Sequence, residues 1–245
     1  MKIIEVQNHC HMGDQIINFI FFNQIKNYIE INNIFIKYYC YERYHKNLFD
    51  FNPSNNISIH PLKPYLKKYY VLWQGDLHGL NPNSPFIEDA LIFMFNLFLK
   101  HFKIDMIVDK FEYDYPKIIE WYDFLDNKYK NADILIINST PLSGQYIYNK
   151  KNWDMQIIEL SKKYKILTTE NVNENILSLE KLPLKDICAI STNVKYIISI
   201  DTGPLMPLFN KYTLNNVENI YIFSCNVYKS RKCISNPIDL MSCIK

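Results

Sequence analysis

Ile134-Leu135-Ile136-Ile137-Asn138-Ser139-Thr140 is a run of four large aliphatic residues that ends abruptly in amide and hydroxyl side chains. An apolar run of this length without alternation is typical of a strand that helices cover on both faces, as in parallel sheets. Ligands of such sheets bind beyond the carboxyl ends of the strands. The stretch therefore predicts both a fold class and the place where a binding site would lie.

The alternation of short apolar runs with helical patterns recurs along the whole chain. We expect further strands at residues 3–6, 34–39, 57–60, 71–73, 165–167, 196–200 and 220–223. We expect helices at residues 14–30, 86–102, 116–125, 153–164, 184–192 and 204–210. Strands that alternate with helices predict parallel sheets with right-handed crossovers. A polar segment at 126–133 separates two such halves, so the predicted fold is α/β, with two Rossmann-like domains (residues 1–127 and 128–245) facing each other across a cleft.

Composition restricts the function classes. The 245 residues are 48% hydrophobic and 21% charged, which is typical of a globular protein, and the formal net charge of +2 argues against nucleic-acid binding through a broad basic field. No secretory signal is visible and no apolar stretch approaches the roughly 20 residues of a transmembrane helix. Six cysteines without a CxxC pair are typical of reduced thiols. We therefore expect a cytoplasmic protein without a nucleic-acid partner or a transmembrane segment.

The loop after the first predicted strand, residues 7–14, contains His11, Gly13 and Asp14. Gly13 permits a tight turn, and Asp14 is either the N-cap of the next helix or a general base that the turn directs into the cleft. The neighbouring His9, Cys10 and His11 do not predict a metal site, because adjacent side chains diverge and no partner motif with zinc spacing follows.

The loop after residues 134–137 leads through hydroxyl groups and Gly144 to Lys150-Lys151-Asn152-Trp153, where a helix is expected to start. Hydroxyls and lysines around a helix N-terminus favour an anion, because free N–H groups and the helix dipole point outward there. An ordinary polar loop with solvated lysines explains the same residues.

A third loop, Asp201-Thr202-Gly203-Pro204, follows the apolar run at 196–200. Asp201 or Thr202 can cap the next helix, and Pro204 suits its first turn. The helix start would be open to a phosphate or a sugar hydroxyl, although a capped helix without a ligand is the plainer interpretation. A further glycine-containing segment at 73–79 is a candidate for acceptor contact.

Together, and in this order, the three loops resemble the ADP-heptose lipopolysaccharide heptosyltransferases and related GT-B glycosyltransferases of family 9. Gly13-Asp14 matches the family's Gly-Asp after its first strand, and Lys151-Asn152-Trp153 matches its Lys-x-Trp. Asp201-Thr202-Gly203-Pro204 matches the Asp-Thr-Gly-Pro-like segment and is the most specific of the three. Only these short motifs match in residues, while the order of elements matches over nearly the whole chain.

The resemblance implies an inverting glycosyltransferase whose partners are a nucleotide-sugar donor, used as co-substrate with no further cofactor, and a glycan or glycolipid acceptor. The sequence has no Asp-x-Asp, the usual metal-holding motif of the other large glycosyltransferase fold, which favours a metal-independent site. Asp14 would be the catalytic base, with His11 and Gly13 in the same cleft loop. Lys151 would hold the donor diphosphate. The other donor-binding residues would be Ser139, Thr140, Thr169, Glu170, Asp201, Thr202 and Gly203.

The sequence departs from the family pattern at Met206, which stands where the family usually has a histidine. Two alternatives therefore stay open: a non-catalytic nucleotide-sugar-binding protein of the same fold, and an enzyme similar to a sugar-nucleotide epimerase. A Rossmann oxidoreductase is not favoured, because no G-x-G-x-x-G follows a predicted strand.

Overall fold

The computed structural model describes residues 1–62, 70–71, 87–110, 114, 117–142, 144, 146–224 and 233–244. The chain divides into two compact units, Met1–Tyr115 and Pro116–Lys245. The boundary predicted from the sequence, between residues 127 and 128, lies later in the chain. The difference has a structural reason: helix α5 (Ile118–Asp123) packs against α7 (Leu184–Ser191) and therefore belongs to the second unit.

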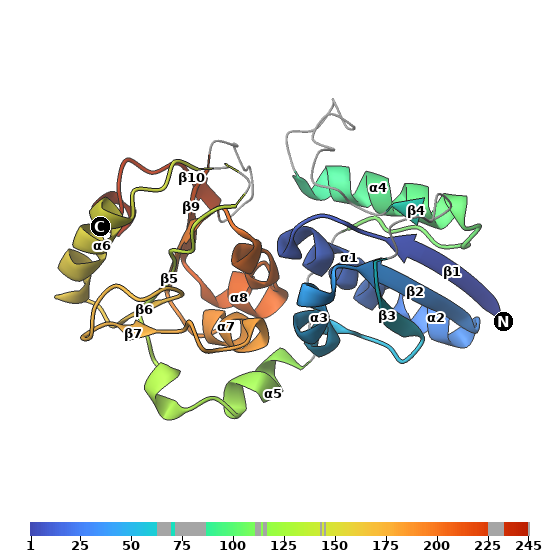
Figure 1. Ribbon diagram of the computed structural model, residues 1–245, viewed down its shortest axis with the longest axis horizontal. Helices are drawn as coiled ribbons and strands as arrows, with labels where there is room; N and C mark the ends of the chain where they lie inside the picture. The colour runs from blue at the N-terminus through green and yellow to red at the C-terminus, as the bar shows by residue number, and fades with distance from the viewer. Residues whose placement is uncertain are drawn as a thin grey trace. The chain divides into compact units, whose positions relative to one another are not determined.

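The first unit contains a parallel sheet in the order β3-β2-β1-β4 (Figure 1). Its strands are β1 (Lys2–Gln7), β2 (Ile34–Cys40), β3 (Ile57–Pro61) and β4 (Tyr70–Val71). Buried and more exposed side chains alternate at the start of β2, where Ile34 and Ile36 are buried and Phe35 is 36% exposed. One face of this part of the sheet therefore carries the core, as expected for the two-residue period of a strand.

Aromatic packing joins the helices of the first unit to its sheet. The helices are α1 (Met12–Gln24), α2 (Lys26–Ile31), the 3-10 turn η1 (Glu42–Tyr44), α3 (His45–Phe51) and α4 (Ile87–His101). Phe21 of α1 stacks on Phe95 of α4 with ring centroids 4.1 Å apart, and Phe19 meets Tyr38 of β2 edge-on at 5.1 Å. These contacts fix α1 against β2 and α4.

The second unit contains a parallel sheet in the order β10-β9-β8-β5-β6-β7. Its strands are β5 (Ile134–Ile137), β6 (Ile166–Thr168), β7 (Leu177–Ser178), β8 (Tyr196–Ile200), β9 (Asn219–Phe223) and β10 (Cys233–Ser235). Read from the other edge, and numbered in chain order, this is the 3-2-1-4-5-6 order of a Rossmann fold, whose direction reverses between β5 and β8.

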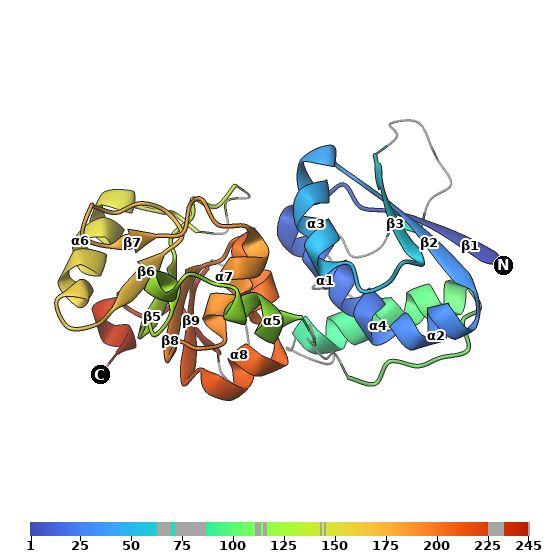
Figure 2. The same cartoon turned by 90° about the horizontal axis from the view of Figure 1, so that it is seen from below.

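Helices cover both faces of the second sheet. Figure 2 shows α6 (Lys150–Ser161) on one side and α7 with α8 (Lys211–Asn216) on the other. Trp153, Ile157 and Leu160 of α6 pack in one cluster with Ile134 and Ile136. All four residues of β5 are buried, so the double coverage that their unbroken apolar run predicts is confirmed.

The helices differ from the sequence prediction most clearly at two places. The helix expected at 14–30 begins earlier, at Met12, and is divided at Ile25 into α1 and α2. The segment expected as a helix at 204–210 is a 3-10 helix, η4 (Gly203–Leu208), followed by α8. Pro207 lies inside η4 and has no N–H to donate, which explains why an α-helix does not continue there.

The chain also contains the 3-10 turns η3 (Asn127–Tyr129) and η5 (Met241–Cys243).

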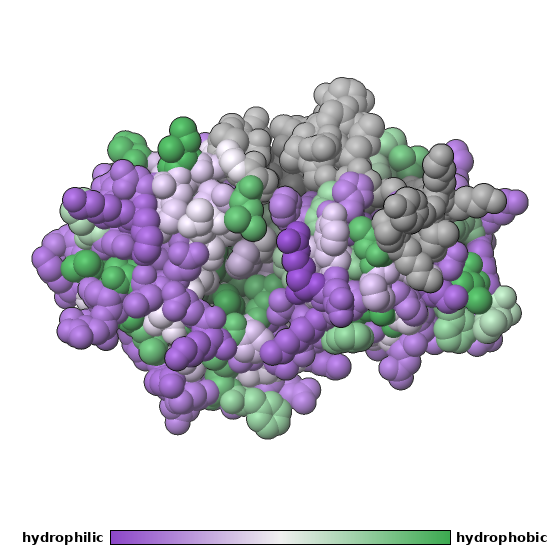
Figure 3. Space-filling model, viewed as in Figure 1, coloured by the Kyte–Doolittle hydropathy of each residue, from purple (hydrophilic) through white to green (hydrophobic). Residues whose placement is uncertain are grey.

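Hydrophilic residues cover much of the face shown in Figure 3, where green hydrophobic residues lie between them. Among the described residues, no helix is both long enough and apolar enough to cross a membrane. The candidate acceptor segment at 73–79 lies outside the described residues.

Candidate functional site

The carboxyl ends of three neighbouring strands of the second unit carry the candidate donor residues. β5 pairs with β6 on one side and with β8 on the other. The residues that follow β5, β6 and β8 therefore leave the sheet together at the carboxyl ends of these strands, which we call the carboxyl edge. The strand order reverses at this place. In open α/β sheets this is the usual place for a ligand.

Asn138, the first residue after β5, joins the ends of β5 and β6. Its side chain is fully buried, and its amide donates to the carbonyl of Glu170 (3.1 Å). Its side-chain oxygen accepts from the N–H of Glu170 (2.8 Å) and from the hydroxyl of Thr169 (3.2 Å). With all these bonds made inside the protein, Asn138 fixes the two loops rather than contacting a ligand.

Ser139 and Thr140 are brought together with Thr169 and Glu170, although they lie about 30 residues apart in sequence. The hydroxyls of Ser139 and Thr169 are 3.0 Å apart, and the N–H of Thr140 donates to the Glu170 carboxylate at 3.2 Å. The sequence proposed all four as donor-binding residues. The structure places them in one hydrogen-bonded group.

Asp201, at the end of β8, is a buried carboxylate that accepts a hydrogen bond from the Ser224 hydroxyl at 2.7 Å. Its own N–H donates to the carbonyl of Phe223 (3.0 Å). The N–H of Ser224 in turn donates to Asn236, near the end of β10 (2.9 Å). Side-chain bonds therefore continue the β8–β9 ladder beyond the strands and hold the start of the Asp201-Thr202-Gly203 segment.

Thr202 and Gly203 begin η4 rather than an α-helix. Thr202 is the N-cap residue, and its hydroxyl donates to the carbonyl of Ile200 at 3.3 Å. The N–H of Leu205 donates back to Thr202 O at 2.9 Å, which closes the first turn. The expected capping position is therefore occupied by Thr202, while the Asp201 side chain bonds Ser224 instead.

The start of α6 separates the roles of its two lysines. Asn149 caps the helix by accepting from the N–H of Asn152 at 3.1 Å. Lys150 is tied to the Asp154 carboxylate and to the carbonyl of Asn171, each at 3.0 Å. Lys151, the lysine of the Lys-x-Trp match, is exposed and has no hydrogen bond or ion pair to any residue that the structure describes.

Tyr148, just before α6, carries a buried hydroxyl with no hydrogen-bond partner among the described residues. Burial raises its pKa above the ordinary tyrosine value, and the charges of Asp154 and Glu170 raise it further. The phenol therefore stays protonated and offers a donor beside the Thr140–Glu170 group. Its ring packs edge-on against Trp153, with centroids 5.7 Å apart.

Asp14, His11 and Gly13 belong to the first unit. Asp14 is not the N-cap of α1, contrary to one reading of the sequence, because the helix begins at Met12 and His11 is the N-cap. The Asp14 carboxylate instead accepts the N–H of His11 at 3.2 Å, in a capping-box arrangement. Gly13 is buried in the first turn.

Among the residues that the structure describes, which include His9, Cys10 and His11, no group of three or more His, Cys, Asp or Glu residues could hold a metal ion.

Sequence reasoning missed Asn138 as a structural residue, and it missed Ser224 and Lys150 as partners at the edge of the sheet. Asn138 directly follows a fully apolar strand, and a buried amide at such a position is itself a signal. Ser224 similarly follows the apolar strand β9. No sequence signal distinguishes Lys150 from Lys151, because their difference depends on Asp154 and Asn171 across a helical turn and a loop.

Comparison with solved structures finds heptosyltransferases. The chain matches E. coli heptosyltransferase WaaC with ADP-2-deoxy-2-fluoro heptose at a TM-score of 0.62 and 12% identity, covering 96% of this chain and 93% of that one. It matches E. coli ADP-heptose lps heptosyltransferase II at 0.58 and 11%, covering 100% and 94%. A family 9 glycosyl transferase from Veillonella parvula matches at 0.56 and 13%, covering 96% and 85%.

The sequence comparisons find nothing: no protein-family model matches the chain, and no curated protein does. At 11–13% identity, the structural likeness establishes the fold. The expected fold class is thus confirmed: the chain has two α/β units, each with a parallel sheet. The chain has the GT-B fold that the heptosyltransferases and the family 9 glycosyl transferase have.

Proposed function

We propose that this protein is a glycosyltransferase that moves a sugar from a nucleotide-sugar donor to a hydroxyl group of a glycan or glycolipid. The fold supports this proposal, because it is shared with structures described as heptosyltransferases and as a family 9 glycosyl transferase. The WaaC structure contains ADP-2-deoxy-2-fluoro heptose, and a second structure of WaaC contains ADP. The three sequence motifs support the proposal independently, since they depend on residue identity and not on the fold.

One observation carries the proposal: the hydroxyl and carboxylate group at the carboxyl edge of the second sheet. Ser139, Thr140, Thr169 and Glu170 are hydrogen-bonded to one another, and β8 delivers Thr202 to the same edge. Hydroxyls and loop N–H groups suit a diphosphate, and a carboxylate suits ribose hydroxyls. Lys151, with no partner among the described residues, supplies a positive charge for the diphosphate.

In the proposed reaction Asp14 accepts the proton of the acceptor hydroxyl as the hydroxyl oxygen attacks the anomeric carbon. The bond between that carbon and the diphosphate breaks, and the nucleoside diphosphate leaves with the electron pair. Direct displacement inverts the anomeric configuration. Lys151 and the hydroxyls of the second unit stabilise the charge on the leaving group, for which preorganised donors typically supply about 10²–10³-fold each. The mechanism requires Asp14 and the donor-binding edge to meet in the reacting complex.

Donor binding is tested first, by thermal shift with ADP-, UDP- and GDP-sugars, including hexoses and heptoses. A ligand at 100 times its dissociation constant stabilises the native state by about 2.7 kcal/mol. A concentration-dependent rise in melting temperature with one nucleotide identifies the donor class. No shift with any nucleotide sugar contradicts the proposal.

Asp14→Asn tests the base. The amide oxygen can still accept the N–H of His11, so the cap of α1 is kept while the proton acceptor is lost. We expect turnover to fall by about 10²–10⁴-fold with nearly unchanged donor affinity. Asp126→Asn is a matched control, because Asp126 caps the exposed turn η3 and should keep wild-type turnover. Wild-type turnover in Asp14→Asn would eliminate its role as base.

Inversion, metal independence and the absence of a further cofactor are part of the proposal and have separate tests. The anomeric configuration of the product, read by NMR, should be opposite to that of the donor. Turnover should persist in excess chelator and without any added cofactor. A retained configuration, or loss of activity that a divalent cation restores, would replace this mechanism with another.

The second candidate is a nucleotide-sugar-binding protein without catalysis. Met206, half-buried within η4, stands where the sequence pattern of the family usually has a histidine, and it favours this reading. Binding of a nucleotide sugar with no turnover toward any acceptor would select it. Isomerisation of the donor in the absence of an acceptor would instead indicate the epimerase-like enzyme.

A further inference from the structure

A chain of buried polar side chains lies beneath the loop that leads to Asp14. Asn8, Gln15, Asn18 and Tyr38 are each fully buried, although they come from the loop after β1, from α1 and from β2. The rings of Phe19 and Phe22 pack edge-on against Tyr38, at centroid distances of 5.1 Å and 5.8 Å. A polar group in such apolar surroundings is costly unless it is hydrogen-bonded.

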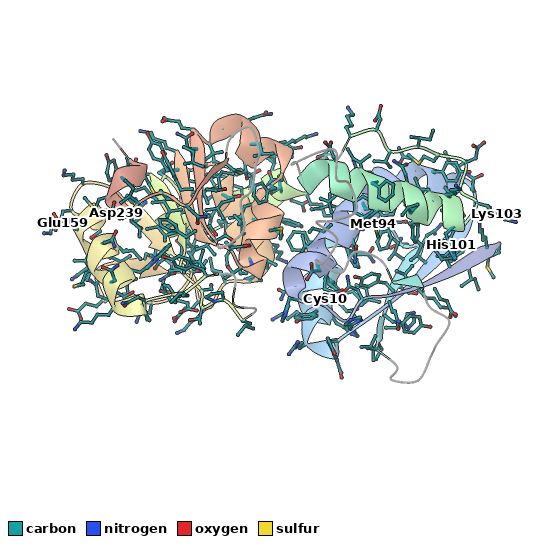
Figure 4. The ribbon with its side chains drawn as sticks, turned by 90° about the horizontal axis from the view of Figure 1, so that it is seen from above. Cys10, Met94, His101, Lys103, Glu159 and Asp239 are labelled. Atoms are coloured by element: carbon teal, nitrogen blue, oxygen red, sulfur yellow. The ribbon has the colours of Figure 1, made fainter. Side chains whose placement is uncertain are left out.

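The buried side chain of Gln15 binds the loop after β1 through hydrogen bonds. The two N–H groups of its amide nitrogen face three acceptors: the carbonyl of Asn8 (3.3 Å), the side-chain oxygen of Asn8 (3.1 Å) and the carbonyl of Cys10 (3.0 Å). The side-chain oxygen of Asn8 also accepts the N–H of Cys10 at 2.8 Å. Figure 4 labels Cys10 at this turn between β1 and α1. In the loop immediately before His11, hydrogen bonds to side chains therefore involve the carbonyls of Asn8 and Cys10 and the N–H of Cys10.

The directions of these bonds are forced. Because the Gln15 nitrogen faces acceptors, its oxygen must face Tyr38, whose hydroxyl donates to it at 2.5 Å. The Tyr38 oxygen then accepts from the amide of Asn18 at 2.8 Å. This orientation leaves the side-chain oxygen of Asn18 buried and without a hydrogen-bond partner among the described residues.

That orphaned oxygen is informative, because a buried acceptor without a partner destabilises the folded state. An apolar residue at position 18 would remove this cost. A contribution to stability alone therefore does not explain why these buried polar side chains are present. Burial raises the pKa of Tyr38 well above its ordinary value, and the charge of the Asp14 carboxylate raises it further. Tyr38 therefore stays a hydrogen-bond donor at every physiological pH.

We propose that Gln15 and Tyr38 are positioning residues for Asp14: through the carbonyls of Asn8 and Cys10 they fix the turn whose His11 N–H holds the Asp14 carboxylate. The inference rests on the proposed role of Asp14 as the base. Asp14 and Gln15 are consecutive residues in the first turn of α1. Gln15 anchors this turn to the protein core, and the position of the Asp14 carboxylate depends on the same turn.

Tyr38→Phe tests the proposal with the smallest change, because it removes the hydroxyl and keeps the packed ring. Tyr39→Phe is the matched control: it removes the hydroxyl of the next residue on β2, which donates instead to Glu5 at 3.2 Å. Gln15→Met removes the amide at similar volume and keeps the proposal testable if Tyr38→Phe is misfolded.

The first readout is amide hydrogen exchange at Cys10 and His11, which requires no activity. We expect exchange at least about tenfold faster in Tyr38→Phe and in Gln15→Met than in the wild type, and unchanged exchange in Tyr39→Phe. Exchange at Cys10 and His11 that matches the wild type in both variants would overturn the proposal. This readout decides the structural part even if the protein proves not to be a transferase.

The second readout is the split between kcat and the donor KM. A misplaced base lowers kcat without affecting donor binding, so we expect about a tenfold loss in kcat and a donor KM within twofold of the wild-type value. A merely structural role would leave kcat per folded molecule unchanged, and that result would refute the positioning role. If Asp14→Asn keeps wild-type turnover, the proposed base fails, while the exchange result still stands or falls separately.

Discussion

At the scale of single residues, the charge of Lys151 is what the proposed donor site depends on. Lys150 already bonds Asp154 and the carbonyl of Asn171, whereas Lys151 has no such partner among the described residues. We expect Lys151→Ala to weaken binding of the nucleoside diphosphate by about 10- to 150-fold, as a charge-assisted contact contributes about 1.5–3 kcal/mol. Isothermal titration measures this.

Lys150→Ala is the natural comparison, because the two lysines are neighbours on α6. It removes an exposed ion pair, which is worth about 0–1 kcal/mol. Its effect on nucleotide affinity should therefore stay within about threefold. If Lys150→Ala weakens binding more than Lys151→Ala does, the assignment of the diphosphate contact is reversed.

A second residue-scale prediction concerns Cys40, which is buried at the end of β2. Burial raises the pKa of its thiol to about 12, so the folded protein keeps this proton to a higher pH than the unfolded chain does. Its contribution to stability is complete below the unfolded pKa and is lost as pH rises toward about 12. We expect the stability difference between wild type and Cys40→Ala to narrow between pH 9 and pH 10.5 in urea titrations. A constant difference would contradict the shift.

At the scale of elements, a buried amide connects η4 with α8. Asn210 caps α8 by accepting the N–H of Thr213 at 2.9 Å, and its amide donates to the carbonyl of Pro207 at 3.1 Å. We expect Asn210→Ala to cost about 2–3 kcal/mol of unfolding free energy, since a cap and a buried partner are lost together. Urea denaturation measures the change.

Asn149→Ala provides the comparison on α6. Asn149 is an exposed N-cap whose side-chain oxygen accepts the N–H of Asn152, so loss of this side chain should cost about 1 kcal/mol. Equal costs for the two caps would mean that the buried amide of Asn210 adds nothing to the capping bond.

Elements that the sequence predicts best are those with their own apolar signature. Residues 134–137 and 196–200 have the bounds of β5 and β8, because β5 is apolar throughout and β8 is apolar except at Ser199, as expected for strands that are covered on both faces. The break between α1 and α2 has no such signature: Ile25 and Ile29 are both buried and continue the helical pattern. The two-residue strand β7 is defined by its pairing with β6, and the sequence of β7 alone does not predict this pairing.

In the candidate site too, the sequence predicts some features and not others. The strands place Ser139–Thr140 and Thr169–Glu170 at the carboxyl ends of a parallel sheet, which the alternation of strands and helices predicts. The side-chain partners depend on directions that the pattern lacks, so Asn138, Ser224 and the orphaned oxygen of Asn18 became visible only in three dimensions.

At the scale of the whole molecule, the two units have different proposed tasks, and hydrogen exchange can separate them. The donor residues lie in loops of the second unit, and the proposed base lies at the start of α1 in the first. A nucleoside diphosphate alone should therefore slow exchange in residues 138–142, 169–171 and 201–203, because a bound ligand suppresses local opening of the segments that it contacts. Residues 8–15 should be unaffected until an acceptor or a complete donor is present. Protection of 8–15 by the diphosphate alone, with none in the three loops, would transfer donor binding to the first unit and reverse the proposed division of labour.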